Sequence, residues 1–292
     1  MLGAMRTLTA MTIMLACGAC GADDAPAQRP LDFGGARPVS LQVPTGFDEA
    51  RAYPLLLVLH GYSVNGFLQQ SYFRLGDAAD AHQTLVLAPE GTRDSNGNQF
   101  WNADPACCDF DRTGVDDVAY LGGLIDEVMA TWPVDPARVT VVGHSNGAFM
   151  AYRLACDRAD IVTAIAGLAG HAASAGTACA PSEPVHVLHL HGTLDETIPY
   201  ESVVLRGVAS PGAVDSVAAW AAHNGCAGGP AASDRKDLDS SLPGAETAVT
   251  VTSRCPAAGA AELWTIEGGT HIPSPAPTLP TELMAWFAAH AR

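Results

Sequence analysis

The fold is decided by one stretch of the sequence, residues 138–156, which reads RVTVVGHSNGAFMAYRLAC. Residues 138–143 are apolar enough for a strand buried on both faces, and 146–157 predicts a helix. Between them Gly-His-Ser-Asn-Gly gives a G-x-S-x-G pattern at a strand-to-helix junction, the context of a nucleophile elbow. Such a turn presents the Ser145 hydroxyl above the sheet, so the stretch predicts a nucleophile. The alternative is that Ser145 only caps the helix.

Apolar runs alternate with helical stretches on both sides of this stretch. Further buried strands are expected at 55–60, 84–88, 162–168, 185–191 and 261–266. Further helices are expected at 71–82, 116–132, 213–223 and 278–290, and an antiparallel edge strand is expected at 39–43. This alternation, together with the elbow, predicts an α/β-hydrolase fold with a mostly parallel sheet flanked by helices. Its chemistry should lie at the carboxyl ends of the strands.

A serine nucleophile needs a base and an acid that orients it, which in this fold follow in the order Ser, Asp, His. Asp195 comes just after the strand at 185–191 and is the predicted acid, with Glu196 as its neighbour. His271 lies in a loop after the last strand, between glycines and a proline, and is the predicted base. His189, His191 and His223 are expected to be structural, His60 is expected to be structural or part of the oxyanion loop, and His290 is expected at the end of a helix. Four aspartates precede Ser145 and fit the chain order badly: Asp109, Asp111, Asp116 and Asp117.

Two loops are expected to complete the site. In this fold an early strand-to-helix loop supplies an oxyanion-hole amide. We predict the backbone N–H groups of Tyr62 and Asn146 as the two donors, and expect the Tyr62 side chain to line the substrate pocket. Trp101 lies in a polar, glycine-containing loop, where an aromatic side chain is predicted to contact substrate. The alternative for Trp101 is a local hydrophobic plug.

Composition excludes several classes of protein. The 292 residues include 15 Lys+Arg and 31 Asp+Glu, a net charge of −16, and 48% are hydrophobic. A chain this apolar is not an acidic disordered one. Its negative charge disfavours nucleic acid and anionic lipid as partners. No set of ligands with suitable spacing predicts a metal site, and the triad chemistry needs no cofactor.

The N-terminus predicts export. Arg6 precedes an apolar run, 8–20, that is too short to span a bilayer and is typical of a signal peptide. Small residues before Cys20 resemble a bacterial lipoprotein signal, so residues 1–20 are expected to be a signal with lipidation of Cys20. The alternatives are lipidation of Cys17 and plain secretion with cleavage near this position. Residues 21–36 are expected to be a flexible linker, followed by one domain over 37–292.

Cysteine count supports an oxidising compartment. If Cys20 is lipidated, six cysteines remain in the domain, which allows three disulfides in fifteen possible connectivities. Such usage is typical of secreted, periplasmic or outer-surface proteins.

Ordered motifs across residues 37–290 resemble a known family. They are Leu-His-Gly-Tyr (59–62), Ala-Pro-Glu-Gly-Thr (88–92), Phe-Trp-Asn-Ala (100–103), Cys-Cys (107–108), Val-Asp-Asp-Val (115–118), Gly-His-Ser-Asn-Gly-Ala (143–148), Tyr-Arg-Leu-Ala-Cys (152–156), His-Gly-Thr-Leu-Asp (191–195) and Gly-Gly-Thr-His (268–271). The set is similar to the secreted polyhydroxybutyrate depolymerase-like esterases, which include feruloyl esterases. The resemblance implies a triad of Ser145, Asp195 and His271, the same residues that chain order indicates.

The resemblance also implies three disulfides: Cys156–Cys179, Cys226–Cys255 and a vicinal Cys107–Cys108. The chain departs from the family at Ala148, where a glycine is usual, and around the base, where Thr270 and Ile272-Pro273 replace a glycine and a Trp-Pro pair.

The sequence therefore predicts an extracytoplasmic serine ester hydrolase that acts through an acyl-enzyme on hydroxyalkanoate, feruloyl or polyester-like esters. An acyltransferase or peptidase could use the same triad, and a non-catalytic surface-binding lipoprotein is a further alternative. The only expected contact with a membrane is a lipid anchor.

Overall fold

The computed structural model describes residues 29–292, so the predicted signal peptide and Cys20 lie outside the described residues. The helices are α1 (Gly66–Phe73), α2 (Leu75–Ala81), α3 (Asp117–Thr131), α4 (Asn146–Asp157), α5 (Ala213–His223) and α6 (Leu279–Ala289). The strands of the main sheet are β3 (Tyr53–Leu59), β4 (Leu85–Leu87), β7 (Val134–His144), β8 (Ala164–Leu168), β9 (His186–Gly192), β12 (Pro230–Lys236), β13 (Thr247–Thr252) and β14 (Ala261–Ile266).

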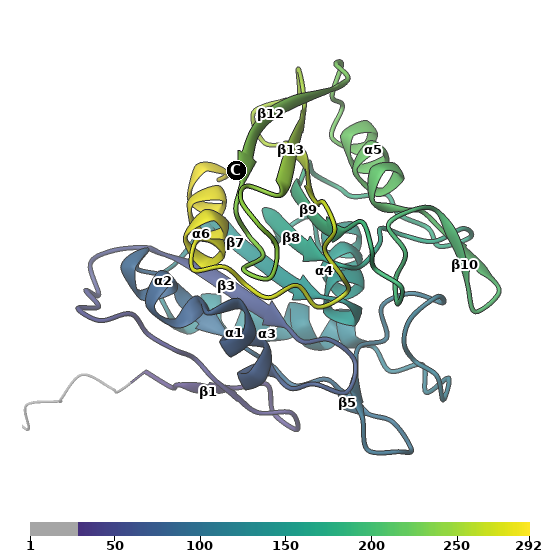
Figure 1. Ribbon diagram of the computed structural model, residues 1–292. Helices are drawn as coiled ribbons and strands as arrows, with labels where there is room; N and C mark the ends of the chain where they lie inside the picture. The colour runs from purple at the N-terminus through teal and green to yellow at the C-terminus, as the bar shows by residue number, and fades with distance from the viewer. Residues whose placement is uncertain (1–28) are drawn as a thin grey trace, which may run out of the picture.

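The sheet has the order β12-β13-β14-β9-β8-β7-β3-β4. The strands from β14 to β4 pair in parallel, whereas β12 and β13 extend the sheet antiparallel. The parallel strands are the six that continuous apolar runs predict. Figure 1 shows the sheet as the middle layer between helices. The predicted α/β-hydrolase fold is confirmed.

Alternate residues of the buried strands pack into two hydrophobic cores, one on each face of the sheet. In β3, Leu55, Leu57 and Leu59 pack with residues of α3, α4 and α5, and Leu56 and Val58 pack with residues of α1, α2 and α6. This follows from the two-residue period of a strand, which sends successive side chains to opposite faces. The central strands are therefore covered on both sides, and their carboxyl ends emerge together at one edge.

Short two-stranded sheets decorate the loops: β1 (Asp32–Phe33) with β2 (Val39–Ser40), β5 (Thr92–Arg93) with β6 (Gln99–Phe100), and β10 (Val203–Leu205) with β11 (Val208–Ser210). The linker prediction is wrong at its C-terminal end. Phe33 pairs with Val39 and is 6% exposed, so the domain already begins before residue 37. The predicted edge strand is shorter than expected, although Gln42 makes an antiparallel bridge to Val86 of β4.

Two other predictions are corrected. The single helix expected at 71–82 is two helices, because Arg74 adopts a left-handed conformation (φ 56°) that ends α1 and starts α2. Strands β12 and β13 were not predicted, since β12 is polar and almost entirely exposed and lacks an apolar run.

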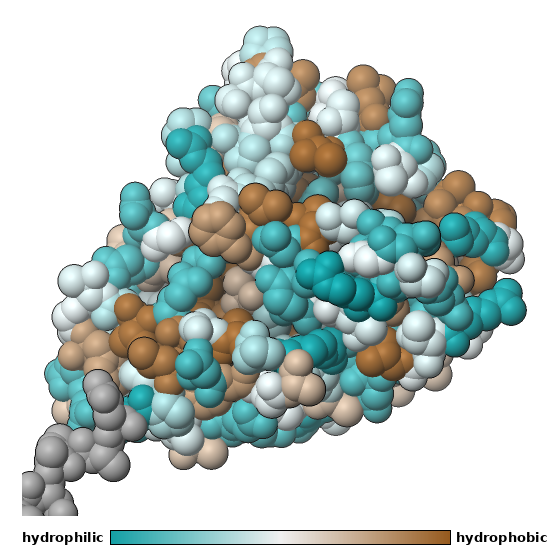
Figure 2. Space-filling model, turned by 90° about the horizontal axis from the view of Figure 1, so that it is seen from below, coloured by the Kyte–Doolittle hydropathy of each residue, from teal (hydrophilic) through white to brown (hydrophobic). Residues whose placement is uncertain are grey.

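The surface view in Figure 2 shows apolar patches separated by hydrophilic residues. Among the described residues, no helix is both long and apolar enough to span a bilayer.

Candidate active site

The turn between β7 and α4 holds Ser145 in a strained conformation. Its backbone has φ 55° and ψ −121°, and its N–H donates to the carbonyl of Leu168 at 2.8 Å. Backbone in a sparsely populated region costs about 1–3 kcal/mol and persists only when its surroundings enforce it. The Ser145 side chain makes no capping hydrogen bond to α4, so the alternative of a simple helix cap is wrong.

Two glycines allow this turn because backbone passes directly over them. A Cβ atom on Gly143 would lie 2.1 Å from the carbonyl oxygen of Gly147. A Cβ atom on Gly147 would lie 2.2 Å from the carbonyl oxygen of Leu59, at the end of β3. The outer residues of G-x-S-x-G are therefore fixed by close backbone approach.

Ala148 occupies the position where a third glycine is usual. The space for its methyl group comes from two glycines, one in β8 and one just after it. A Cβ atom on Gly170 would lie 2.6 Å from the Ala148 Cβ, and one on Gly167 would lie 3.4 Å from it. Because Gly167 and Gly170 have no side chain, the Ala148 methyl group fits against them.

Three loops bring Ser145, His271 and Asp195 together. His271 Nε2 lies 2.9 Å from Ser145 Oγ, and His271 Nδ1 lies 2.8 Å from Asp195 Oδ2. Ser145 follows β7, Asp195 follows β9 and His271 follows β14, all at the carboxyl edge of the sheet. Ser145 is partly exposed, whereas the Asp195 side chain is fully buried. The arrangement is a hydrogen-bonded Ser–His–Asp triad.

Asp195 is held by three hydrogen-bond donors and faces a fourth N–H group. Its Oδ1 accepts the backbone N–H groups of Thr197 (2.9 Å) and Ile198 (2.8 Å), while Oδ2 faces His271 and, at 3.3 Å, His191 Nε2. Burial opposes ionisation, but hydrogen bonds from the two histidines and the amides outweigh it and hold the pKa of Asp195 well below its ordinary value. The carboxylate is therefore charged and fixed in direction.

The other candidates lie elsewhere. Glu196 and His223 are exposed on the surface. Asp116 caps α3, and Asp117 pairs with Arg37 at 2.6 Å. None of these side chains contacts Ser145 or His271 among the described contacts.

Gly61 brings the loop after β3 against the nucleophile. A Cβ atom on Gly61 would lie 3.5 Å from the Ser145 Cβ. Within residues 29–292, the backbone N–H groups of Tyr62 and Asn146 have no hydrogen-bond acceptor. They are thus available as oxyanion donors, a role that stays a prediction. The Tyr62 hydroxyl donates to Asp94, and its ring packs on Phe110 with centroids 5.0 Å apart.

The prediction that Trp101 contacts substrate is wrong. Trp101 has 0% of its surface exposed, and its indole N–H donates to the carbonyl of His60 at 3.0 Å. The Asn146 side chain grips its backbone: Asn146 Oδ1 accepts from Trp101 N–H (2.7 Å) and Nδ2 donates to Trp101 C=O (2.9 Å). Trp101 is therefore the plug that joins the elbow to the loop carrying Gly61 and Tyr62.

Sequence reasoning missed this clamp and also the role of His144. The His144 Nε2–H donates to the backbone carbonyl of His271 at 2.8 Å, and the two rings lie 5.1 Å apart. Burial lowers the pKa of His144 to about 4, so the ring is neutral at pH 7. The x position of G-x-S-x-G thus anchors the main chain of the base, and the sequence contains no signal for this contact.

Three disulfides join the pairs that the family resemblance implies: Cys107–Cys108, Cys156–Cys179 and Cys226–Cys255. Cys156 lies on α4, so its bridge ties the helix behind the nucleophile to the loop at 171–179. Asp104 holds the same loop by accepting hydrogen bonds from Ser174 and Thr177. No group of three His, Cys, Asp or Glu residues within 29–292 is arranged to hold a metal ion.

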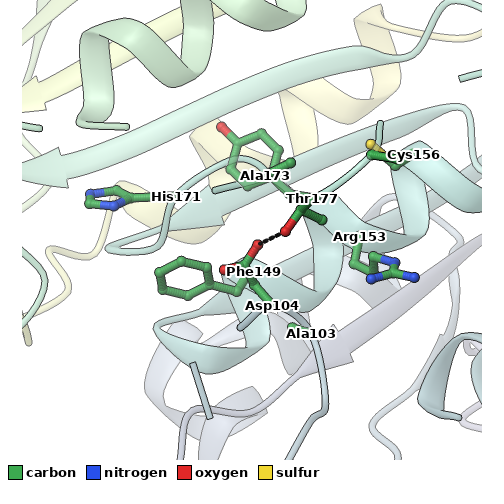
Figure 3. A pocket seen from close by; sticks show the side chains of 10 residues that line it. Ala103, Asp104, Phe149, Arg153, Cys156, His171, Ala173 and Thr177 are labelled. Atoms are coloured by element: carbon green, nitrogen blue, oxygen red, sulfur yellow. Dashed lines mark hydrogen bonds between the residues drawn. The ribbon is translucent and has the colours of Figure 1, made fainter. Parts of the chain in front are cut away.

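A small pocket lies behind the triad, beside α4. Figure 3 shows Phe149 and His171 on one side of it and Arg153 and Cys156 on the other, with the hydrogen bond between Asp104 and Thr177 drawn across it. Its volume of about 10 Å³ has room for about one water molecule, so it does not hold an acyl group.

Exposed apolar side chains flank two members of the triad in the sequence. Leu194 precedes Asp195 and Ile272 follows His271, and each side chain is 63% exposed. Phe110, packed on Tyr62, is 39% exposed. Exposed apolar side chains beside a reactive group are suited to contacting the apolar parts of a ligand.

The fold and the triad define an α/β-hydrolase with the constellation used for nucleophilic acyl transfer. The chain matches the model of the Esterase family, described as "Putative esterase", over residues 32–240, and it belongs to that family. It is 31% identical over 202 residues to feruloyl esterase B of Piromyces equi, an alignment that covers 66% of this chain and 37% of that protein.

A second curated protein and a solved structure are also similar to this chain. The probable feruloyl esterase C of Aspergillus niger is 26% identical over 196 residues, covering 65% of this chain and 63% of that one. An acetyl xylan esterase from Aspergillus awamori has the same fold, with a TM-score of 0.61 at 13% identity over 90% of this chain and 98% of that chain. The chain spans less than half the length of feruloyl esterase B.

Proposed function

We propose that this protein is a serine carboxylic-ester hydrolase that works through an acyl-enzyme. The observation that carries the proposal is the continuous hydrogen-bonded line from Ser145 Oγ through His271 to Asp195 Oδ2, at 2.9 and 2.8 Å. Family membership supports it.

The geometry assigns each group a step. His271 Nε2 removes the proton of Ser145 Oγ as the oxygen attacks the ester carbonyl, and the bond that forms is the acyl–serine ester. Asp195 keeps the His271 Nδ1 proton directed towards itself and stabilises the imidazolium. The backbone N–H groups of Tyr62 and Asn146 donate hydrogen bonds to the carbonyl oxygen of the ester as it becomes negatively charged. His271 then returns its proton to the leaving alcohol, and water clears the acyl group by the same route.

For substrates we favour esters with an aromatic or otherwise apolar acyl group, of the feruloyl type. The names of two relatives and the exposed apolar side chains of Leu194, Ile272 and Phe110 support this choice. Hydroxyalkanoate oligomers and polyester dimers are the other candidates, and they form the comparison in the test.

We also propose that the protein acts outside the cytoplasm, anchored by lipid at Cys20. The signal-like N-terminus and the three disulfides support this proposal. Metabolic labelling with a palmitate analogue should mark the wild-type protein and not Cys20→Ala. Equal labelling of both would refute lipidation at Cys20.

The activity is tested with Ser145→Ala, assayed on p-nitrophenyl butyrate, methyl ferulate and hydroxybutyrate oligomers. We expect a loss of about 10³-fold or more in kcat and no labelling by a fluorophosphonate probe. Ser253→Ala, at an exposed serine far from the triad, is the matched control and should keep both. Hydrolysis that survives Ser145→Ala would refute the assignment, and the order of kcat/KM values on the three esters tests the substrate class.

A further inference from the structure

A chain of buried polar side chains continues from the triad into the core. The Tyr152 hydroxyl lies 2.6 Å from His189 Nδ1, and His189 Nε2 lies 3.0 Å from His191 Nδ1. His191 Nε2 lies 2.8 Å from the carbonyl of Ile198 and 3.3 Å from Asp195 Oδ2. Nothing in the reaction described above uses these three residues.

For a neutral His191 ring, the last members of this chain set the direction of every proton in it. A carbonyl oxygen and a carboxylate can only accept, so His191 Nε2 must carry the proton. In a neutral ring His191 Nδ1 is then an acceptor, so His189 Nε2 donates to it, and His189 Nδ1 accepts from the Tyr152 hydroxyl. Burial of His189 lowers its pKa well below the ordinary value, so this ring is neutral.

The hydrogen-bonded side chains occupy buried positions that apolar side chains could fill. His189 and His191 have 0% exposure and lie on the same face of β9 as Val187, which packs in the apolar core. The neighbour of His189 on β8 is Gly167, where a Cβ atom would lie 3.3 Å from the Tyr152 ring. Burying polar rings is unfavourable unless they are hydrogen-bonded, and apolar residues would fill this face without that cost. The polar residues of β9 on this face are the two nearest the triad.

We infer that Tyr152, His189 and His191 are positioning residues for the acid: together they fix the tautomer of His191 so that its Nε2 carries the proton, which is donated to the Ile198 carbonyl and faces Asp195 Oδ2 at 3.3 Å. This inference rests on the proposed hydrolysis. The Asp195 oxygen that binds His271 then faces a second imidazole N–H at 3.3 Å. The partial positive charge of this N–H stabilises the carboxylate and weakens its basicity, which limits how strongly it attracts the proton on His271 Nδ1.

Other polar side chains lie near Asp195 and His271. The test must separate their effects from those of the hydrogen-bonded chain. His144 faces His271 from β7, and His171 lies 5.5 Å from His191, centroid to centroid. Tyr200 lies with its ring edge on His191 at 5.7 Å, and its hydroxyl bonds to Thr265 instead of to the chain. Tyr200→Phe is therefore a control that removes a phenol from the same neighbourhood without breaking the chain.

The test combines kinetics with NMR. His191→Phe keeps a ring and removes the N–H. We expect kcat to fall about 10-fold or more with KM within about twofold, and the acidic limb of kcat/KM to move to higher pH, because a more basic Asp195 raises the pKa of His271. Tyr152→Phe should shift the limb in the same direction by less, and Tyr200→Phe should leave it in place.

The NMR measurement keeps the inference testable if a variant does not fold. Long-range ¹H–¹⁵N spectra of the wild-type protein should show the Nε2–H tautomer for both His189 and His191. An Nδ1–H tautomer at His191 would overturn the inference, as would an unmoved acidic limb in His191→Phe or an equal shift in Tyr200→Phe. Failure of the proposed function would be recognised separately, as a wild-type protein that hydrolyses no ester.

Discussion

Replacing Asn146 by alanine tests how the oxyanion loop is held. The substitution keeps the backbone N–H at position 146, so the proposed oxyanion donor itself remains. It removes the amide that grips both backbone groups of Trp101, at 2.7 and 2.9 Å. Trp101 in turn holds the carbonyl of His60, immediately before Gly61 and Tyr62. The change therefore loosens one wall of the site without removing a reacting group.

The size of the effect follows from the buried groups that lose their partners. Asn146 and Trp101 are both fully buried, so an unpaired N–H and an unpaired C=O would remain, at about 1–3 kcal/mol each. We expect the free energy of unfolding to fall by about 2–6 kcal/mol. Deleting one oxyanion donor costs about 10²–10³ in kcat, which is an upper bound for a displaced donor. We expect kcat to fall by about 10- to 100-fold.

Asn224 provides a matched control. Its side chain grips the backbone of Val185 in the same way, accepting from N–H at 3.0 Å and donating to C=O at 2.7 Å, and it is 2% exposed. Val185 precedes β9, whereas Asp195 follows that strand, so this clamp lies at the opposite end of the sheet from the triad. Asn224→Ala should lose comparable stability in urea unfolding and keep its kcat on p-nitrophenyl butyrate. Equal loss of kcat in both variants, or full activity in Asn146→Ala, would refute the reasoning.

Three further substitutions test the packing around the site. Burial lowers the pKa of His144 to about 4 in the folded protein, below its unfolded value, so between about pH 6.5 and 4 the unfolded chain binds a proton that the folded protein does not. The free energy of unfolding should therefore fall by about 2 kcal/mol from pH 7 to 5 through this group. His144→Gln should show a shallower fall in urea titrations. Gly170→Ala, whose Cβ would lie 2.6 Å from that of Ala148, should lower stability by about 1–3 kcal/mol, with partial recovery when Ala148→Gly is added in thermal unfolding. Trp101→Phe, which loses the hydrogen bond to the carbonyl of His60, should reduce kcat with little change in KM, and unchanged kcat would show that the bond does not hold the loop.

The parallel part of the fold could be predicted because its strands are buried on both faces and are therefore apolar along their length. The strand at 138–143 was recognisable for this reason, and the helix after it followed from the G-x-S-x-G junction. β12 could not be found this way, since its residues are exposed and it joins the sheet only by pairing with β13. The break between α1 and α2 depends on the backbone of Arg74, which no local pattern indicates.

The site shows the same division between local and distant signals. Chain order and strand ends are local features, and they led to Ser145, Asp195 and His271, which the structure brings within hydrogen-bond distance. Trp101 was misinterpreted because an aromatic residue in a polar loop looks exposed until its partners are known. Those partners, Asn146 and His60, are 45 and 41 residues away. These two contacts are fixed by the tertiary fold, and no local pattern at Trp101 indicates them.

The buried imidazoles around the triad share a property that bears on its chemistry. Burial lowers the pKa of His60, His144, His171 and His189, so these rings remain neutral at pH 7 while serving as hydrogen-bond donors and acceptors. A charged ring at any of these positions would also be attracted to the Asp195 carboxylate, and its positive charge would disfavour the charged form of His271. Neutral rings leave that field to the imidazolium formed when Ser145 loses its proton. A histidine-rich core is therefore compatible with a single proton acceptor in the reaction, provided that each of its other rings is buried and hydrogen-bonded.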